Sequence, residues 1–557
     1  MDLTIGEQLD RFLRNAGITA AFGVPGGQTL PLYGAAADSG RMHVVMRDER
    51  NAACAADAYA RVNGTIGVCD ATVGPGVTNL VSGLAEAYAS GIPVVALVAD
   101  IRRSAEHLRE RGVASQAASQ REMLAPVSKW IARIEQPRML ARMVEHAVRV
   151  AVTGRPGPVV IEIPEDVFLG NAESATPPDV TVDDTRFPRF RSAPAPAALD
   201  AALALLSTAE RPIVIAGGGV TLTGAAAAVC SLAERTGIPI ATTINGKGTI
   251  DERHPLAIGV IGIFGTPYAN DVVRRADVIV AIGTKFDQLS THAWRLILDD
   301  QRLVHVDADG EELGRTRRVD VPVLADALEF ATAALARLAQ AGYRAPEWVA
   351  AVPRTAAPGT SGDDPSIGPE HVVQALDRHL DAGDLLVSDA SLSSGWAAAH
   401  YRVKSSGVGM LAPRGLAGIG WMPGAAIGAR LAASDDRKVV GIAGDGAWAY
   451  GLAEVETATR YALDLVFVVL NNSHLGWIKH AADEMGFRAN VGFGDVDFAA
   501  AARAMGACGA VVSRPDDLDD ALRAAIGSGG VHVIDVRTSA ESSPTTKISR
   551  HRTGPYA

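Results

Sequence analysis

The chain has 557 residues, of which 48% are hydrophobic and 21% charged, and its formal net charge is −11. This length predicts about three or four domains, each with its own core, and the composition is typical of a soluble globular protein. The acidic balance argues against nucleic acid as the main partner. No apolar run approaches the roughly 20 residues that a membrane-spanning helix needs, so we expect no membrane association.

The first residues and the cysteines indicate the compartment. The N-terminus, Met1-Asp2-Leu3-Thr4, has neither the basic nor the apolar region of a signal peptide. The 4 cysteines are scattered without a CxxC spacing, which argues against a disulfide framework and against a zinc site. We therefore predict a cytoplasmic protein.

Residues 1–175 predict a first α/β domain. Helical stretches at 5–15 and 51–62 alternate with short apolar runs at 66–70 and 93–98. Continuous apolar runs of this length are typical of strands that are buried on both faces of a parallel sheet.

A proline-rich passage, 175–196, is typical of a linker and precedes a second block, residues 195–345. This block has a strand pattern at 212–216, a glycine turn at 217–219 and another strand pattern at 277–282. We expect a central Rossmann-like domain here.

A second loose passage, 346–369, leads into the last block, residues 365–540, which is followed by a tail, 541–557. The tail is expected to be either disordered or a lid. The fold class is thus α/β, with three doubly wound parallel-sheet domains whose ligands would lie beyond the carboxyl ends of the strands. The expected strands of the last block span 384–388, 438–443, 465–470 and 531–536.

The most informative motif follows the strand at 438–443. Gly444-Asp445-Gly446 forms a tight turn, and Asn472 follows the next strand, 27 residues (472 − 445) beyond Asp445. A carboxylate and an amide at neighbouring strand ends can share one hard cation, and Mg²⁺ keeps coordination sites for phosphate. The glycines let the backbone approach a phosphate. The turn alone can be an ordinary Asp-Gly turn, but the turn and Asn472 together predict a metal-bound diphosphate.

This segment, GDGAWAYGLAEVETATRYALDLVFVVLNN, resembles the thiamine diphosphate motif, and the whole chain resembles the acetolactate synthase-like branch of the thiamine diphosphate enzymes. The resemblance implies a pyrimidine-binding, a central and a diphosphate-binding domain, in that order. Four further stretches carry it: FGVPGGQTLPLY at 22–33, RDERNAACAADAYAR at 47–61, ATVGPGVTNLVSGLAEAYASGIPVV at 71–95 and GLAGIGWMPGAAIGA at 415–429.

The resemblance implies thiamine diphosphate and Mg²⁺ as cofactors. Asp445, Asn472 and the backbone carbonyl of His474 would hold the metal, while the His474 imidazole would face substrate or solvent. Four further residues would lie against the cofactor's diphosphate: Gly444, Gly446, Ser391 and Ser393.

Glu49 is the residue to which the resemblance assigns cofactor activation. It would hydrogen-bond N1′ of the cofactor's pyrimidine ring and so promote loss of the proton from the thiazolium carbon. A carboxyl group in an apolar pocket can share a proton in this way. The alternative is a helix-capping acid, because Asp48-Glu49 opens a helix.

Other residues would contact the pyrimidine ring. Ile419 would be a bulky apolar wedge under the bent cofactor, and the backbone around Gly418 would bind the pyrimidine edge. The turn at Gly74 and the following helix with Asn79 would lie near the ring and the subunit contact. The alternatives are an ordinary core isoleucine and a plain tight turn.

Two glutamines would face the substrate. Gln116 matches a family glutamine that reaches the reacting centre from the partner subunit, and Gln28 lies in a loop that resembles the family's substrate-side loop. The alternative for both is an exposed glutamine without a role.

Three departures from the family bear on the ligands. Where FAD-binding acetolactate synthases tend to read Ala-Arg-Phe-Asp-Asp-Arg, this chain reads TKFDQL at 284–289. Because the bidentate arginine contacts are missing, we expect a vestigial Rossmann-like domain without FAD. The biosynthetic enzymes also carry a tryptophan where this chain has Ala481, and Gly-Gln-His-Gln where it has Ser-Leu-Ser-Ser at 391–394. These differences leave the branched-chain amino-acid role and the acceptor preference open.

The residues and the resemblance together predict a thiamine diphosphate- and Mg²⁺-dependent carboligase. It would decarboxylate a 2-oxo acid such as pyruvate and transfer the acyl carbanion to a second carbonyl compound. The enzyme would be a homodimer or homotetramer in which Glu49 of one chain and Asp445 of another share a site. One alternative keeps the cofactor but is a decarboxylase, a 2-hydroxyacyl lyase or a diketone C–C hydrolase. The other is a non-catalytic, cofactor-binding regulatory paralogue.

Overall fold

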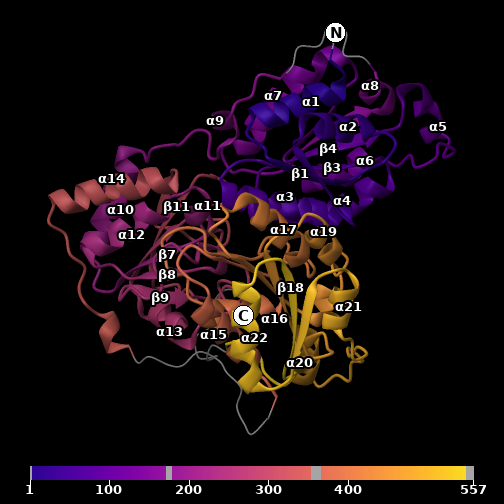
Figure 1. The fold of residues 1–557 in the computed structure, drawn as a ribbon. Helices are drawn as coiled ribbons and strands as arrows, with labels where there is room; N and C mark the ends of the chain where they lie inside the picture. The colour runs from indigo at the N-terminus through magenta and orange to yellow at the C-terminus, as the bar shows by residue number, and fades with distance from the viewer. Residues whose placement is uncertain (1–2, 171–177, 353–365, 547–557) are drawn as a thin grey trace.

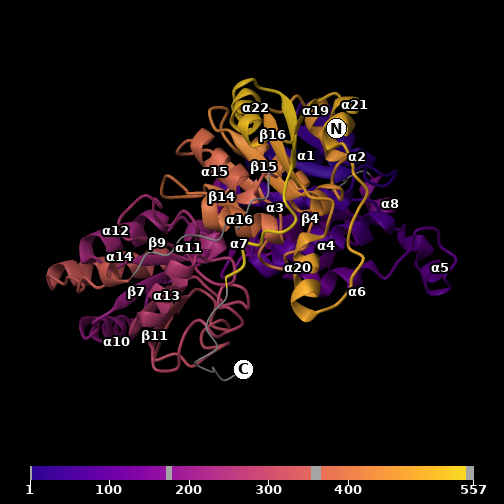
Figure 2. The same cartoon turned by 90° about the horizontal axis from the view of Figure 1, so that it is seen from below.

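The computed structural model describes residues 3–170, 178–352 and 366–546. They form three domains, each built on one six-stranded parallel sheet with helices packed around it (Figure 1). The predicted α/β class with three parallel sheets is therefore confirmed. Seen from below, the central domain lies to one side, while the N- and C-terminal domains pack against each other (Figure 2).

The N-terminal sheet has the strand order β2-β1-β3-β4-β6-β5. β3 and β4 are buried along their whole length, as the apolar runs predicted. The strands are β1 (Ala20–Val24), β2 (Met42–Val45), β3 (Gly67–Ala71), β4 (Val94–Asp100), β5 (Trp130–Arg133) and β6 (Val159–Pro164). The helices are α1 (Ile5–Asn15), α2 (Leu30–Ser39), α3 (Glu49–Asn63), α4 (Pro75–Ser90), α5 (Glu106–Glu110), α6 (Gln120–Leu124), α7 (Leu140–Val152) and α8 (Glu165–Phe168).

The central sheet has the order β12-β11-β10-β7-β8-β9. Its glycine turn is required by a close approach of two strand ends, since a Cβ added to Gly217 would lie 2.2 Å from the carbonyl oxygen of Gly283. The strands are β7 (Pro212–Ala216), β8 (Ile240–Thr242), β9 (Ala257–Val260), β10 (Val278–Ile282), β11 (Arg302–Asp307) and β12 (Val321–Leu324). The helices are α10 (Pro196–Ser207), α11 (Gly218–Leu222), α12 (Ala226–Thr236), α13 (Pro267–Arg275) and α14 (Ala327–Gln340).

The C-terminal sheet has the order β14-β13-β15-β16-β18-β17. β15 and β16 are neighbours, and their register pairs Gly444 with Leu470, so the GDG turn and Asn472 leave the sheet at the same edge. The strands are β13 (Leu385–Ser388), β14 (Met410–Leu411), β15 (Val439–Gly444), β16 (Leu465–Asn471), β17 (Cys508–Val512) and β18 (Val531–Arg537). The helices are α15 (Pro369–His379), α16 (Leu392–His400), α17 (Met422–Ala432), α18 (Asp445–Trp448), α19 (Glu454–Arg460), α20 (Gly476–Met485), α21 (Phe498–Ala504) and α22 (Pro515–Gly527).

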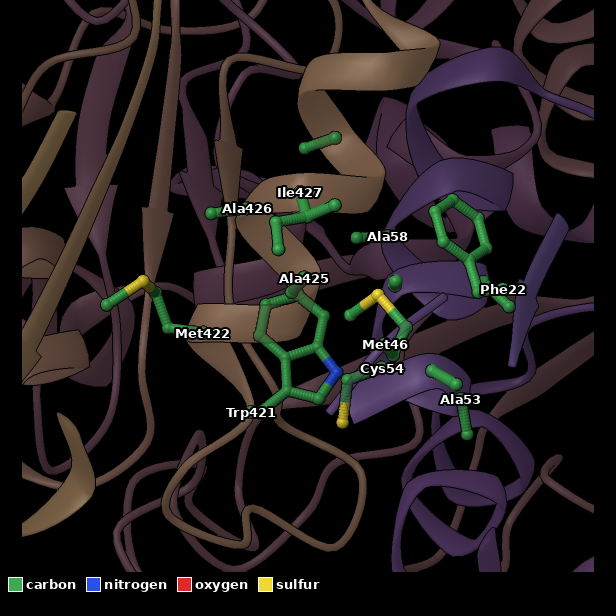
Figure 3. Packing of buried hydrophobic residues seen from close by; sticks show 14 of the residues in the cluster. Phe22, Met46, Ala53, Cys54, Ala58, Trp421, Met422, Ala425, Ala426 and Ile427 are labelled. Carbon is green, nitrogen blue, oxygen red and sulfur yellow. The ribbon is translucent and has the colours of Figure 1, made fainter. Parts of the chain in front are cut away.

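The N- and C-terminal domains are joined by helices α3 and α17, which lie side by side at their boundary (Figure 1). The two backbones nearly touch, because a Cβ added to Gly428 would lie only 1.9 Å from the carbonyl oxygen of Ala55. Figure 3 shows Ile427 and Trp421 directed from the C-terminal domain toward α3, where Cys54 is buried. Small residues on both helices thus create a tight, apolar contact between the domains that carry the two halves of the predicted site.

For the linker and the C-terminal tail, the structure matches the sequence-based predictions in part. The described part of the predicted linker at 175–196 includes a short helix, α9 (Val182–Thr185), which begins with a capping box between Thr181 and Asp184. The C-terminal segment is held to the central domain as far as Thr546, whose N–H donates to the carbonyl of Ile263 at 2.8 Å. The rest of the tail lies outside the described residues, so a lid stays a prediction. Within the described ranges, no helix is both long and apolar enough to cross a bilayer.

Candidate active site

A cavity of about 350 Å³ opens where β15 and β16 end, at the edge where a parallel sheet holds its ligands. Apolar side chains, including Leu475 and Trp477, form much of its remaining wall. The predicted residues that line it are Ser391, Ser393, Ile419, Gly444, Asp445, Gly446, Asn472 and His474. The structure therefore brings the predicted diphosphate and metal residues together.

Asp445 begins α18 directly after β15, with Gly444 as the N-cap residue. Its side chain is buried, and its Oδ1 accepts the N–H of Gly446 at 2.8 Å. Burial raises the pKa of Asp445, although the surrounding backbone N–H groups lower it. Among the described residues, no lysine or arginine forms an ion pair with this carboxylate. A cation from solution would therefore offset the cost of burying its charge.

The two asparagines at the end of β16 face different surroundings, because neighbouring strand residues point to opposite sides. The Nδ2 group of Asn471 donates inward, to Oδ1 of Asp535 at 2.9 Å and to the carbonyl of Val496 at 3.1 Å. Asn472 lines the cavity, and its Oδ1 accepts the N–H of His474 at 3.1 Å. The Asn471 side chain thus stabilises the fold, and of the two asparagines only Asn472 offers an amide oxygen to the cavity.

His474 follows a sharp turn, at which Ser473 has a left-handed φ of 57°. Its imidazole Nδ1 lies 2.8 Å from the carbonyl oxygen of Asn472. The ring is therefore held by the turn itself, although it also lines the cavity.

The two predicted diphosphate serines differ in what their hydroxyl groups already bind. Ser391 is the N-cap residue of α16 and makes no side-chain capping bond. The Ser393 hydroxyl donates to the carbonyls of Asp389 and Ala390, at 3.2 and 2.8 Å. Ser391 and the free N–H groups of the first turn of α16 are therefore the better-placed donors for an anion.

Ile419 projects from a loop, residues 415–420, that two buried carboxylates hold from either side. Glu86 comes from α4 of the N-terminal domain and is 3% exposed. It accepts three backbone N–H groups of the loop, each at 2.8 Å, from Gly415, Leu416 and Ala417. The loop of the C-terminal domain is thus fixed by a side chain of the N-terminal domain.

Asp389, at the end of β13, holds the other side of the loop. Its carboxylate is fully buried and accepts the N–H groups of Gly420 at 2.9 Å and Met422 at 2.8 Å. Burial raises its pKa to about 6 against the effect of these donors. Ile419 itself lines the cavity and packs against the core, whereas the neighbouring Gly418 is exposed and does not line the cavity.

Glu49 is the first residue of α3, and only 7% of it is exposed. The N-cap residue of α3 is Asp48, which accepts the N–H of Arg50, and Glu49 lies in the first turn, where an acid is also favoured by the helix dipole. One carboxylate oxygen of Glu49 accepts Nδ2 of Asn79 at 2.9 Å. The other lies close to Gly76, where an added Cβ would be 3.0 Å away. Glu49 is thus buried and oriented, as a group that shares a proton must be.

Gly74, Gln116 and Gln28 lie near the same edge of the N-terminal sheet. Gly74 has a φ of 68°, and a Cβ there would lie 2.1 Å from the carbonyl oxygen of Gln116, so glycine is required. Gln116 itself has a left-handed φ of 59°. The Gln28 side chain accepts the hydroxyl of Thr72 at 2.9 Å.

The predicted residues therefore form two groups within one chain. The C-terminal group surrounds the cavity at Asp445, whereas Glu49, Asn79, Gly74, Gln116 and Gln28 do not line that cavity. One chain by itself does not bring Glu49 and Asp445 into one pocket among its described residues.

The central domain has a larger cavity, of about 770 Å³, at the carboxyl edge of its sheet. Its wall includes Gly218, Lys285 and Asp307, together with Arg155 of the N-terminal domain. Burial raises the pKa of Asp307 to about 6 and lowers that of Lys285. The space can hold a ligand, and the expected absence of FAD stays a prediction.

Sequence reasoning did not identify Glu86 or Asp389, the two carboxylates that hold the loop of Ile419. Asp389 stands at a strand end, which is a recognisable position for a site residue in a parallel sheet. Glu86 lies inside α4, where its partners come from a loop about 330 residues away, and no local pattern reveals such a contact.

Comparisons with known proteins agree with this geometry. Three family models match: the N-terminal TPP binding domain of thiamine pyrophosphate enzymes over residues 3–124, their central domain over 199–334 and their C-terminal TPP binding domain over 389–536. A probable acetolactate synthase large subunit of Methanocaldococcus jannaschii is 32% identical over 95% of this chain and 91% of its own. The acetolactate synthase large subunit of Parasynechococcus marenigrum is 34% identical over 94% and 86%.

The fold and the three matching family models define a thiamine diphosphate-dependent enzyme. The chain belongs to the thiamine pyrophosphate enzymes, in their acetolactate synthase-like family, and is a carboligase.

Proposed function

We propose that this enzyme decarboxylates pyruvate or a closely related 2-oxo acid and joins the acyl group to the carbonyl carbon of a second molecule. The observation that carries this proposal is the shared cavity of Asp445, Asn472 and Ile419 at one sheet edge. The names of the relatives, acetolactate synthases, support the same reaction class. When bound, thiamine diphosphate supplies an electron sink that allows CO₂ to leave.

The residues at this edge fit Mg²⁺ and a diphosphate. Asp445, Asn472 and the backbone at His474 offer a carboxylate, an amide and a carbonyl oxygen, which are the hard ligands that Mg²⁺ prefers. Within the described ranges, no group of three or more His, Cys, Asp and Glu residues can hold a metal. We therefore propose a metal that completes its coordination with phosphate oxygens, and Ser391 with the start of α16 as further anion donors.

Glu49 would hold or release a proton at the pyrimidine ring, with Asn79 keeping its carboxylate in place. Gly74 and the backbone at Gly418 would contact the ring, and Gln116 and Gln28 would face the substrate. The alternative of a non-catalytic paralogue is weaker, because a protein that only binds the cofactor has no need of a buried, oriented carboxyl group at this position.

We also propose that each site lies between two chains of a homodimer or homotetramer. The two groups of site residues are apart within one chain, so a second chain must complete the pocket. Large apolar side chains between residues 478 and 496 support such a contact between chains, because they are exposed to solvent in the single chain. They are Ile478 (46%), Met485 (69%), Phe487 (68%), Phe493 (48%) and Val496 (43%).

Three finer points stay part of this proposal. The domains would span residues 1–175, 195–345 and 365–540, the enzyme would be cytoplasmic, and the central domain would bind no FAD. The last point is tested by the absorption spectrum of the purified enzyme, in which a bound flavin would be visible.

The test of the function is a product screen. The enzyme is incubated with thiamine diphosphate, Mg²⁺ and ¹³C-pyruvate, alone and with an added aldehyde or 2-oxo acid, and the products are identified by mass spectrometry. Coupled products are expected. Acetaldehyde alone indicates a decarboxylase, cleavage of added hydroxyacyl compounds or diketones indicates a lyase or hydrolase, and cofactor binding without any turnover indicates the regulatory paralogue.

A Glu49→Ala variant provides the control for catalysis. It should keep most of the affinity for thiamine diphosphate and lose about 10²–10⁴-fold in turnover, the usual contribution of an acid–base group. Turnover at the wild-type rate would contradict the role of Glu49.

A further inference from the structure

Strand β2 leads to Glu49 and is the outermost strand of the N-terminal sheet. Its inner side pairs in parallel with β1. Among the described residues, no strand pairs with its outer side. Backbone N–H and C=O groups on the edge of a sheet need other partners when they are shielded from water. The partners on this edge therefore decide how firmly the approach to Glu49 is held.

Side chains of the C-terminal domain of the same chain supply these partners. Tyr461, which directly follows α19, accepts the N–H of Val45 with its hydroxyl oxygen at 2.9 Å. The same hydroxyl donates to the carbonyl of His43 at 3.0 Å. Arg460 donates from Nη2 to the carbonyl of Val45 at 2.7 Å. The two side chains thus bind backbone groups that a neighbouring strand would otherwise pair.

Glu454, the first residue of α19, binds the same edge nearer to Glu49. Its carboxylate is fully buried and accepts the N–H of Arg47, two residues before Glu49, at 3.1 Å. The hydroxyl of Thr457 donates to the other carboxylate oxygen at 2.7 Å and so orients the group. The Asn51 side chain, two residues after Glu49, is a further hydrogen-bond neighbour of this carboxylate. Glu454 therefore contacts the chain on both sides of Glu49.

The spacing of these contacts follows the alternation of a strand. His43, Val45 and Arg47 are two residues apart, so their backbone groups point to the same side. The intervening Met46 donates its N–H inward, to the carbonyl of Gly23 at 2.8 Å. A helix of 7 residues such as α19 is about 10 Å long, and four steps along a strand measure about 13 Å. The two ends of α19 thus meet the two ends of the segment that precedes Glu49.

The edge-binding residues, Tyr461, Arg460 and Glu454, lie away from the proposed metal and diphosphate ligands. None of them is among the described residues that line the cavity of Asp445. Helix α19 lies beside α17, at the boundary with the N-terminal domain (Figure 1). Changing an edge-binding residue should therefore act on the approach to Glu49 and leave the cavity itself intact.

We propose that the edge-binding residues are positioning residues: by holding the outer edge of β2, they fix the place at which the Glu49 carboxylate meets the pyrimidine ring of the cofactor. This inference rests on the proposed role of Glu49. A misplacement of about 1 Å can lower a rate about 100-fold. Loss of these bonds should thus slow the proton transfer that Glu49 serves, while the diphosphate stays bound.

The test measures loss of the proton from the thiazolium carbon in the absence of any substrate. Enzyme with thiamine diphosphate and Mg²⁺ is diluted into D₂O and quenched with acid at set times, and the remaining proton on that carbon is measured by ¹H NMR. Tyr461→Phe removes both bonds of the hydroxyl and should slow the exchange about 10- to 100-fold. The affinities for thiamine diphosphate and Mg²⁺ should stay within about twofold.

Tyr343→Phe is the matched control. The Tyr343 hydroxyl donates to the carbonyl of Leu206 at 3.2 Å in the central domain, so the same chemical change is made away from Glu49. Its exchange rate should stay within about twofold of wild type.

A second pair of variants carries the test if Tyr461→Phe does not fold. Glu454→Gln keeps an acceptor oxygen for the N–H of Arg47, whereas Glu454→Met keeps none. The glutamine variant should therefore retain more of the exchange rate at the thiazolium carbon than the methionine variant. Equal rates in the two variants would contradict the role of Glu454.

The contact itself is tested on the protein without cofactor. Amide hydrogen–deuterium exchange, read by mass spectrometry over residues 40–48, should be faster in Tyr461→Phe than in wild type, because the N–H of Val45 loses its partner. Unchanged protection of this segment would overturn the proposal, since the hydroxyl would then not hold the strand in solution.

The other outcomes are equally distinct. Wild-type exchange at the thiazolium carbon in Tyr461→Phe, with a lower unfolding midpoint, would leave the edge-binding residues a role in stability only. A parallel loss of thiamine diphosphate affinity would assign their effect to cofactor binding, and an equal loss in Tyr343→Phe would show a general effect of the substitution. Glu49→Gln separates the two proposals. If it exchanges as fast as wild type, the proposed role of Glu49 fails; if it is slow and Tyr461→Phe is not, only the role of the edge-binding residues fails.

Discussion

The carboxylate of Glu86 accepts the backbone N–H of Ala417 at 2.8 Å, and this bond links the N-terminal domain to the loop that carries Ile419. Glu86 and Ala417 belong to the same chain. Glu86 lies two turns after Asn79 on α4, and Asn79 in turn orients Glu49. A single helix therefore connects the proposed proton-handling carboxylate of one site to the Ile419 loop, which in the proposed oligomer serves the other site.

The first prediction concerns this link. Glu86→Gln removes the charge and one acceptor oxygen from a group that receives three loop N–H bonds. We expect a loss of about 2 kcal/mol in the free energy of unfolding and a fall in kcat of about 10- to 100-fold through misplacement of Ile419. Calorimetry and steady-state kinetics measure both. Glu122→Gln, at an exposed glutamate, is the control. A kcat within twofold of wild type would show that the loop does not depend on Glu86.

The second prediction separates the two asparagines of the motif. Asn471→Ala takes a donor from the buried Asp535 carboxylate and should lower stability by about 1–3 kcal/mol. It should leave the Mg²⁺ requirement unchanged. Asn472→Ala should raise the Mg²⁺ concentration for half-maximal activity about tenfold or more with little effect on the unfolding midpoint. If both variants shift the Mg²⁺ titration equally, the assignment of Asn472 alone to the cavity is wrong.

The third prediction concerns Glu454, a fully buried glutamate at the contact between the N- and C-terminal domains, which accepts the N–H of Arg47 at 3.1 Å. Burial raises its pKa from 4.5 to about 7. Between these values the folded protein binds more protons than the unfolded chain, so this group's stabilising contribution is complete below pH 4.5 and is lost as pH rises through 7. The full effect is up to about 3 kcal/mol.

Urea unfolding of wild type and Glu454→Gln between pH 5 and 8 measures this contribution. The wild-type midpoint should decline with rising pH more steeply than that of Glu454→Gln, in which the titrating group is gone. Glu456→Gln, on the same helix but with 35% side-chain exposure, should keep the wild-type slope. Identical slopes for wild type and Glu454→Gln would contradict the prediction.

The fourth prediction concerns the contact of α3 with α17. Gly428→Ala places a Cβ 1.9 Å from the carbonyl oxygen of Ala55, so the helices must separate, and we expect a loss of about 1–3 kcal/mol in stability. Gly34→Ala lies in α2 and meets no atom within 4 Å, so it should stabilise the protein by up to about 1 kcal/mol. Thermal unfolding compares them. Equal midpoints would refute the tight contact.

Much of the fold could be predicted, because strands buried on both faces give continuous apolar runs. β7 was predicted with its observed limits, 212–216, and β16 to within one residue. The GDG turn and Asn472 could be assigned to one site because their strands are neighbours. Glu86 could not be found, since its contacts with the loop at 415–417 join segments that are distant in the sequence. Such features are properties of the packing and not of local sequence.

The central claim is that Glu49 of one chain and Asp445 of another form each active site. Glu49→Gln and Asp445→Asn are each expected to be inactive alone. Co-expressed in equal amounts, they should recover roughly a quarter of wild-type activity, because half of the randomly formed dimers are mixed and each mixed dimer has one intact site. The turnover of the co-expressed, purified mixture is the direct measurement. Recovery near one quarter supports shared sites, whereas activity no higher than that of the separate variants would contradict the account.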